Sequence, residues 1–121
     1  MASKPETKVV KEIRKALDIN YPGFYFKTHG GPFQMAGLPD IIGLHRGVFI
    51  GIEVKCPGKE DTLTQKQINV LGKIKSAGGI AFMSTSPEDT LKKLKGEFKD
   101  VKRKTKRRTN DGEGKKTPSN L

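Results

Sequence analysis

Two acids and a lysine, Asp40, Glu53 and Lys55, are the residues whose types and spacing point most directly to chemistry. Glu53 and Lys55 flank one apolar residue in an alternating run, so in a β-strand they would project from one face, about 7 Å apart at their Cα atoms. Asp40 opens the preceding apolar run. Two carboxylates beside an ammonium group suit a divalent cation and an activated water, which are the parts of a hydrolytic site.

A short hairpin would place Asp40 beside Glu53. If residues 46 and 47 form a two-residue loop, the register puts Asp40 directly opposite Glu53, and a longer loop would shift it by one or two residues. Opposed side chains have Cβ atoms about 4.5–5.5 Å apart, where two carboxylates either share a proton or hold a cation. Such an oxygen-rich site favours Mg²⁺ or Mn²⁺, and the nearby backbone carbonyl of Val54 could be a further ligand.

Each of these residues also has an ordinary interpretation. Asp40 could be a loop acid after proline, and Glu53 and Lys55 could be solvent-facing residues of a half-exposed strand. Only their combination, aligned by alternation and by the hairpin register, favours a site.

The pattern of apolar, glycine and proline residues predicts the elements that would position this site. Helices are expected at 6–20, 64–77 and 86–98, and strands at 24–28, 41–44, 48–56 and 80–83. The order α-β-β-β-α-β-α predicts an α/β fold in which helices flank one small mixed central β-sheet.

The charge of the chain points to a polyanionic partner. The sequence has 24 Lys and Arg against 13 Asp and Glu, a formal net charge of +11. Such a surface attracts nucleic acid above all, although solubility or ribosome-like binding without catalysis would give the same composition. Residues 99–121 are basic with few apolar side chains, so we expect a disordered tail after a folded domain at 1–98.

Cysteine content and hydropathy bear on location. A single cysteine, Cys56, excludes an internal disulfide and a cysteine metal cluster, which fits a reducing cytoplasm. No apolar stretch approaches the ~20 residues of a membrane span, and the first residues lack the apolar core of a signal peptide. We therefore expect a cytoplasmic protein with no membrane partner.

The motifs, taken in order, resemble the VRR-NUC family of the PD-(D/E)XK nuclease superfamily, whose name is nearly spelled out by Pro39-Asp40 and by Glu53 and Lys55. The resemblance covers roughly residues 5–94. Its elements are an early helical Glu6, Gly37-Leu38-Pro39-Asp40-Ile41-Ile42-Gly43, Phe49-Ile50-Gly51-Ile52-Glu53-Val54-Lys55, a Leu-Thr-x-x-Gln segment at 63–67 and Ala77-Gly78-Gly79. The family often has an aromatic residue three positions after the helical glutamine, whereas this chain has Val70 there.

The resemblance implies a restriction-endonuclease-like fold and a role for each matching residue. Asp40 and Glu53 would hold Mg²⁺ or Mn²⁺, Lys55 would be the catalytic lysine, and Gln67 would be an accessory active-site residue. Glu6 would reach the metal directly or through water. The residues alone leave alternatives open, because Gln67 also fits a capping box and a glutamate in the first turn of a helix suits the helix dipole.

The sequence thus predicts a metal-dependent endodeoxyribonuclease. Stand-alone members of the family in phages and bacteria resemble Holliday-junction resolvases that act as homodimers, which implies branched DNA and a second copy as partners in a bacterial or infected host cell. Contacts with DNA are expected from His29 and the basic run of the tail, namely Lys102, Arg103, Lys104, Lys106, Arg107 and Arg108. Two rivals stay open: a basic nucleic-acid-binding module without catalysis on a nuclease-like fold, and a nuclease subunit that needs a partner.

Overall fold

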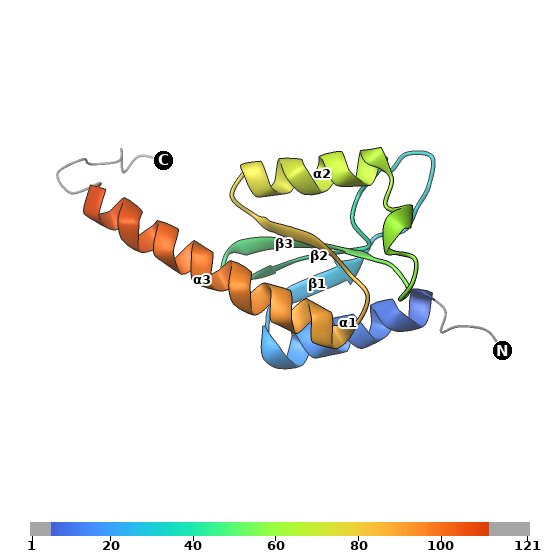
Figure 1. Ribbon diagram of the computed structural model, residues 1–121, viewed down its shortest axis with the longest axis horizontal. Helices are drawn as coiled ribbons and strands as arrows, with labels where there is room; N and C mark the ends of the chain where they lie inside the picture. Colours follow the sequence, from blue (N-terminus) through green and yellow to red (C-terminus); the bar gives the residue numbers. More distant parts are fainter. Residues whose placement is uncertain (1–5, 112–121) are drawn as a thin grey trace.

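The computed structural model describes residues 6–111, which form helices on both sides of a four-stranded β-sheet (Figure 1). The elements are α1 (Glu6–Asn20), β1 (Phe24–Lys27), β2 (Ile41–His45), β3 (Val48–Val54), the 3₁₀ helix η1 (Glu60–Thr62), α2 (Gln65–Ser76), β4 (Ile80–Ser84) and α3 (Pro87–Asp111). The predicted order of helices and strands is confirmed, and η1 is an addition that the sequence did not predict.

The sheet is mixed, as predicted, with the strand order β1-β2-β3-β4. Strands β1, β2 and β3 are antiparallel neighbours, and β4 joins β3 in parallel after the crossover through α2. The β2–β3 hairpin closes with Arg46 at φ 51° and Gly47 at φ 80°, the two positive angles that a tight two-residue loop requires. Strand β3 ends at Val54, two residues before the predicted end, because a turn with a hydrogen bond from the Lys59 amide to the Cys56 carbonyl follows.

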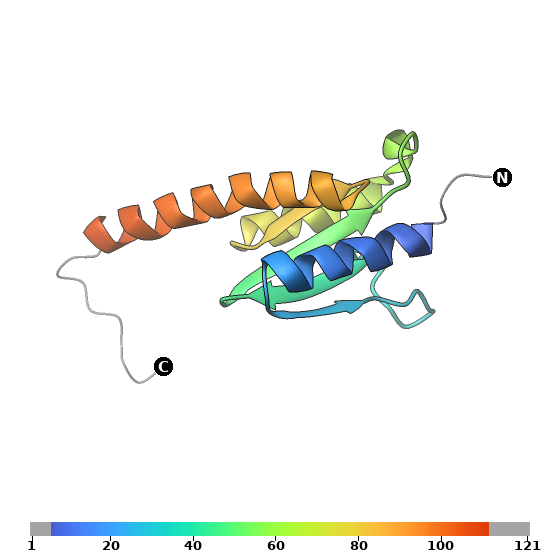
Figure 2. The same cartoon turned by 90° about the horizontal axis from the view of Figure 1, so that it is seen from below.

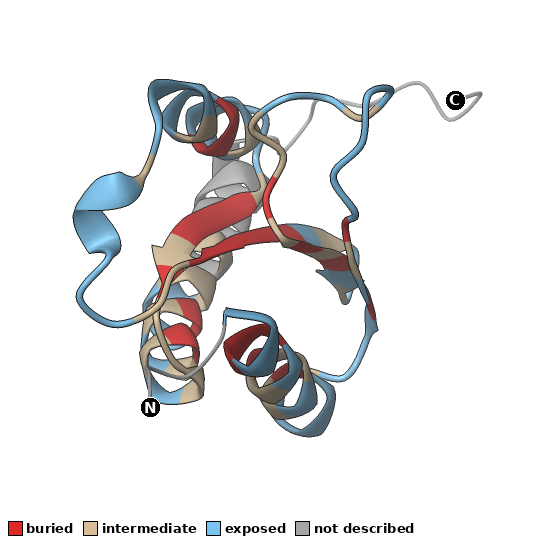
Figure 3. Ribbon diagram, turned by 90° about the vertical axis from the view of Figure 1, so that its right-hand side faces the viewer, coloured by how far each residue is buried: buried red, intermediate tan, exposed pale blue. Residues whose placement is uncertain are grey.

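Helices α1 and α3 share one face of the sheet, and α2 covers the other (Figures 1 and 2). The inward-facing apolar residues of strands, α1 and α3 form the core, and Figure 3 shows buried residues on these facing surfaces. This core contains Val9, Val10, Ile13, Leu17, Tyr25, Ile41, Ile50, Ile52, Val54, Ile80, Phe82 and Leu94. Alternation along β3 sends Ile50, Ile52 and Val54 into this core, so the residues between them face α2.

Helix α2 packs on the β3–β4 half of the sheet through Val70 and Leu71. Its approach is close, because a Cβ atom on Gly51 would lie only 3.0 Å from the Ile74 side chain. On the β1–β2 half of the same sheet face, Phe24, Phe26 and Leu44 remain exposed.

Helix α3 extends past the predicted end of the domain. The sequence predicts disorder from residue 99, but α3 continues to Asp111, and Val101 packs against the core. The prediction was wrong for 99–111, because lysine and arginine are good helix formers and neither glycine nor proline stands between Gly96 and Gly112. The rest of the predicted tail, 112–121, lies outside the described residues. No helix in the described part combines the length and apolar character needed to cross a membrane.

Candidate active site

Asp40 and Glu53 face each other where β2 begins and β3 approaches its end. The β2–β3 pairing runs as far as Ile41 opposite Ile52, so the next pair in this register is Asp40 and Glu53, as the hairpin predicts. The Val54 amide donates a 2.8 Å hydrogen bond to Asp40 Oδ2, which fixes this carboxylate against the end of β3. Backbone pairing, rather than a mobile loop, therefore sets the separation of the two acids.

Thr28 anchors the backbone of Asp40 from the other side. Its amide donates a 2.8 Å hydrogen bond to the Asp40 carbonyl, which continues the β1–β2 pairing by one residue. Its hydroxyl donates to the Pro39 carbonyl at 2.8 Å, and the side chain is buried. Asp40 is thus held between β1 and β3, a role for Thr28 that the sequence did not reveal because threonine at a strand end has no distinctive pattern.

Glu53 is the buried acid of the pair, with only 3% of its surface exposed. Its Oε2 accepts a 3.0 Å hydrogen bond from Gln67 Nε2 and lies 3.8 Å from Lys55 Nζ. That second distance is within ion-pair range but too long for a hydrogen bond. Its Oε1 is buried without a hydrogen-bond partner. A buried carboxylate oxygen without a donor is costly, so this atom marks a place where the fold favours an added cation or a proton.

The electrostatics of the site favour that proton in the protein without metal. Burial raises the pKa of Glu53 from 4.5 to about 8, and the negative charge of Asp40 adds to the rise. A hydrogen bond between the two carboxyl groups acts in the same direction, Lys55 opposes the shift, and the charge of Glu6 adds to it. Burial and the charge of Asp40 therefore favour a protonated Glu53 at neutral pH in the absence of metal, and a divalent cation would displace this proton.

Gln67 caps α2, as its position in the sequence suggested, and it also contacts Glu53. The Thr64 hydroxyl accepts a hydrogen bond from the Gln67 amide, and Gln67 Oε1 accepts one from the Thr64 amide at 2.8 Å, which completes a capping box at the start of α2. The other end of the same amide group donates to Glu53. The cap therefore fixes the side chain in the orientation that contacts the acid.

A hollow of about 270 Å³ opens over these residues. Its floor contains Asp40, Glu53 and Gln67, and its wall comes from the loop between β1 and β2 through Gly30, Gly31, Gln34, Met35, Ala36, Gly37 and Leu38. Gly37 allows the close approach of this wall to α2, because it has φ +83° and its Cβ would lie 2.6 Å from the Lys66 carbonyl oxygen. Residues 30–38 contain three glycines, but nothing in the sequence assigned this loop to the site.

The side chains that line the hollow could hold Mg²⁺ or Mn²⁺ if a substrate supplied some of the ligands. Within the part of the chain that the structure describes, no group of three or more His, Cys, Asp or Glu side chains could hold a metal ion. The site instead offers two carboxylates, one of them with the partnerless Oε1 atom. Mg²⁺ commonly binds one or two carboxylates and completes its shell with water and phosphate oxygens, so two acids suffice for a site filled with substrate.

Other predicted site residues lie farther out. Glu6 is exposed at the start of α1 and acts on Glu53 through its charge, but it does not join the two acids in a cluster. His29 is exposed, next to a residue of the hollow but not itself in the wall. The predicted DNA contacts at 102–108 lie on α3 beyond Val101, the last residue whose side chain is described.

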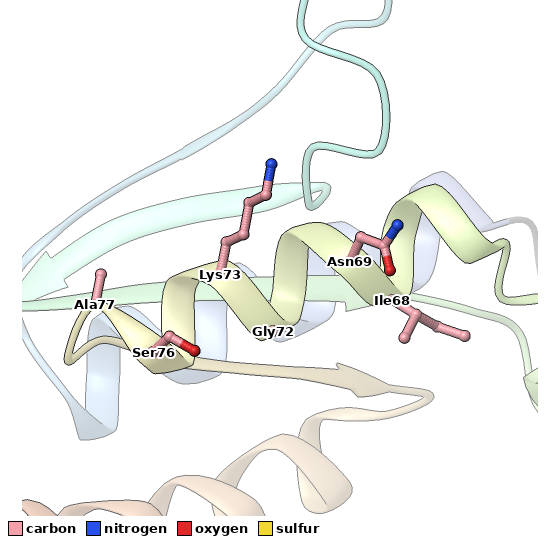
Figure 4. Close-up of a pocket in the computed structure, with 6 residues that line it drawn as sticks. All are labelled: Ile68, Asn69, Gly72, Lys73, Ser76 and Ala77. Carbon is pink, nitrogen blue, oxygen red and sulfur yellow. The ribbon is translucent and has the colours of Figure 1, made fainter.

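A second hollow lies along α2 and has a different character (Figure 4). Its lining comes from that helix and its C-terminal cap, namely Ile68, Asn69, Gly72, Lys73, Ser76 and Ala77. It contains no carboxylate, so it lacks the acid that metal binding or acid–base chemistry would need. The catalytic assignment rests on the hollow of Asp40 and Glu53.

No family model matches the chain, and a search of curated proteins found no match.

Proposed function

We propose that this protein is a metal-dependent endodeoxyribonuclease that hydrolyses phosphodiester bonds at the hollow of Asp40 and Glu53. The observation that carries the proposal is the pair of opposed carboxylates, in which Glu53 is buried with a partnerless Oε1 and has Lys55 Nζ 3.8 Å from Oε2. Holding two acids side by side in a hollow, one of them buried, costs free energy through desolvation and like-charge repulsion. A cation between them removes that cost.

Asp40 and Glu53 would hold the ion, and Glu6 would act through water. When bound, Mg²⁺ or Mn²⁺ supplies a Lewis acid for the scissile phosphate and lowers the pKa of a water. The Val54 amide faces Asp40, and in an extended strand the carbonyl of a residue leaves by the same edge, so we infer that the Val54 carbonyl adds an oxygen there. These ligands leave open positions for phosphate oxygens.

Lys55 and Gln67 would act on the groups that react. The Lys55 ammonium lies beside the acids with a side chain only 12% exposed, so it can orient the attacking water and offset negative charge that grows on the phosphate. Gln67 holds Glu53 in place through its hydrogen bond, which strengthens when Glu53 loses its proton.

We also propose a family, a DNA substrate and an oligomeric state for this protein. The motif order at 37–43, 49–55 and 63–67 supports membership of the VRR-NUC family and a restriction-endonuclease-like version of the mixed α/β fold. The same resemblance supports DNA branches, such as four-way junctions, as substrate and a homodimer as the active form, since two sites related by a twofold axis can cut two strands symmetrically.

The test is cleavage of four-way junction, flap, duplex and single-stranded DNA in Mg²⁺ or Mn²⁺, with binding measured beside it. We expect the protein to cut at least one of these, Asp40→Asn and Lys55→Ala to abolish cutting, and Asp61→Asn, at an exposed acid of η1, to retain it. Equal cutting by all four proteins would refute the assignment. Tight binding of DNA without cutting in any metal would favour the non-catalytic module, or a nuclease subunit that needs its partner.

A further inference from the structure

An apolar groove lies beside the catalytic hollow. It has a volume of about 430 Å³, within the range of ligand sites in proteins, and it runs between the loop before β2, strand β3 and helix α2. The residues that matter for its chemistry are Met35, Leu38, Phe49, Val70, Lys73 and Ile74.

The groove and the catalytic hollow share a wall. Met35 and Leu38 line both of them, so the segment from 35 to 38 has the acids on one side and the groove on the other. Gly37 fixes this partition to α2, because its backbone approaches the Lys66 carbonyl too closely for any side chain. A strand of nucleic acid with a phosphate in the hollow would therefore have the groove within reach of an adjoining nucleotide.

The lining of the groove matches the flat face of a nucleobase. Phe49 and Met35 are 38% and 53% exposed and present an aromatic ring and a flexible thioether. Lys73 supplies the only charged side chain among the lining residues, and it can pair with a phosphate. The other lining residues have no polar side-chain atom that could read a base edge, so stacking would be tolerant of sequence.

We propose that this groove binds an unstacked nucleobase of the DNA strand whose phosphate lies over Asp40 and Glu53. The proposal rests on the proposed nuclease function and names a substrate class for it: DNA in which the base beside the scissile phosphate is unpaired or easily unpaired, as at a branch, flap or mismatch. A continuous duplex must first break its stacking to fill the groove, so it binds more weakly.

The absence of tryptophan from the sequence allows a direct test. Phe49→Trp places a single indole in the groove, where a stacked base quenches its emission. Phe24→Trp is the matched control, because Phe24 lies in the same row of the sheet, opposite Leu44, which in turn pairs with Phe49. Both variants are titrated in chelator with branched and with fully paired DNA, and the anisotropy of labelled DNA measures binding independently.

We expect branched DNA to quench the indole of Phe49→Trp, with a much smaller change for paired duplex and for Phe24→Trp. Loss of one stacked base weakens binding by about 5- to 150-fold. Compared with the unaltered protein, Phe49→Ala should therefore bind branched DNA more weakly by this factor and bind duplex with about the same affinity. Met35→Ala, at a half-exposed position, should show the same selective loss.

Three results would overturn the groove assignment. The first is binding of branched DNA with equal emission changes in both tryptophan variants, or with none. The second is a change in the emission of Phe49→Trp when its concentration is raised in the absence of DNA. That result would indicate that a second copy of the chain occupies the groove. The third is failure of the unaltered protein to bind any DNA, which alone would also overturn the nuclease proposal.

Discussion

Replacing Glu53 by glutamine should stabilise the metal-free protein at high pH. Glutamine has the size and shape of a protonated glutamate, so its side-chain oxygen can keep the hydrogen bond from Gln67. The variant therefore mimics protonated Glu53 and, unlike Glu53, cannot ionise at high pH.

The sign and size of the effect follow from the pKa of Glu53. Burial and Asp40 raise this pKa from 4.5 to about 8, so between these values the folded state holds a proton that the unfolded chain has released. The stabilisation from this group is complete below about pH 4.5 and is lost as the pH rises through about 8. At ~1.4 kcal/mol per pH unit the full loss approaches ~5 kcal/mol, and structural relaxation would reduce it to roughly 2–5 kcal/mol.

The assay is urea unfolding in chelator at pH values from 5 to 9. We expect Glu53→Gln and wild type to agree within ~1 kcal/mol at pH 5 and the variant to be more stable by roughly 2–5 kcal/mol at pH 9. Glu60→Gln, at an exposed acid of η1, should follow wild type throughout. Added Mg²⁺ should stabilise wild type at pH 8 but not Glu53→Gln, because metal binding needs the carboxylate.

A stability difference that does not change with pH, or a variant that is less stable throughout, would refute the reasoning. Either result would mean that Glu53 is ionised and satisfied in the folded protein without metal. The partnerless Oε1 would then have no bearing on a cation site.

Three further outcomes can be measured on the same protein. Gln67→Ala should lower the free energy of unfolding in urea by ~1 kcal/mol and slow cleavage. Thr64→Ala should lower the stability by about as much but leave cleavage intact. Equal losses of cleavage in the two variants would make Gln67 only a helix cap. Leu94→Ala removes a fully buried side chain and should cost about 2–5 kcal/mol, and a loss under ~1 kcal/mol would contradict the packing of α3 on the sheet. Deleting 102–121 should weaken DNA binding and flatten its salt dependence, while the protein still unfolds cooperatively. The truncation begins after Val101 because that residue packs on the core. Non-cooperative thermal unfolding of the truncated protein would contradict this prediction.

The element order and the opposition of the two acids could be predicted from the sequence because both follow from local rules. Alternation from Val48 to Val54 assigns faces to side chains, and the Arg46-Gly47 pair sets a hairpin register that admits little variation. The capping box of Gln67 is likewise a short-range pattern. Each of these predictions needed only neighbouring residues.

The walls of the site could not be predicted in the same way. The loop before β2 has no periodicity, and its position depends on the contact of Gly37 with α2, which is distant in sequence. The anchoring of Asp40 by Thr28 depends on the β1–β2 register, which no tight turn reveals. The length of α3 could not be predicted from the low apolar content of 99–111, because Lys and Arg favour helices and Val101 still packs on the core.

The most direct test of the account is the single-turnover rate at which the wild-type protein and Asp40→Asn cut a branched DNA, in chelator and in Mg²⁺ or Mn²⁺. Asp40→Asn keeps the size of the side chain and an oxygen that can accept from the Val54 amide, so the local structure should persist while the charge that holds the cation is lost. We expect cutting by wild type only with metal, and a rate at least about 100-fold lower for Asp40→Asn. Cutting in chelator, or equal rates for the two proteins in Mg²⁺, would contradict it.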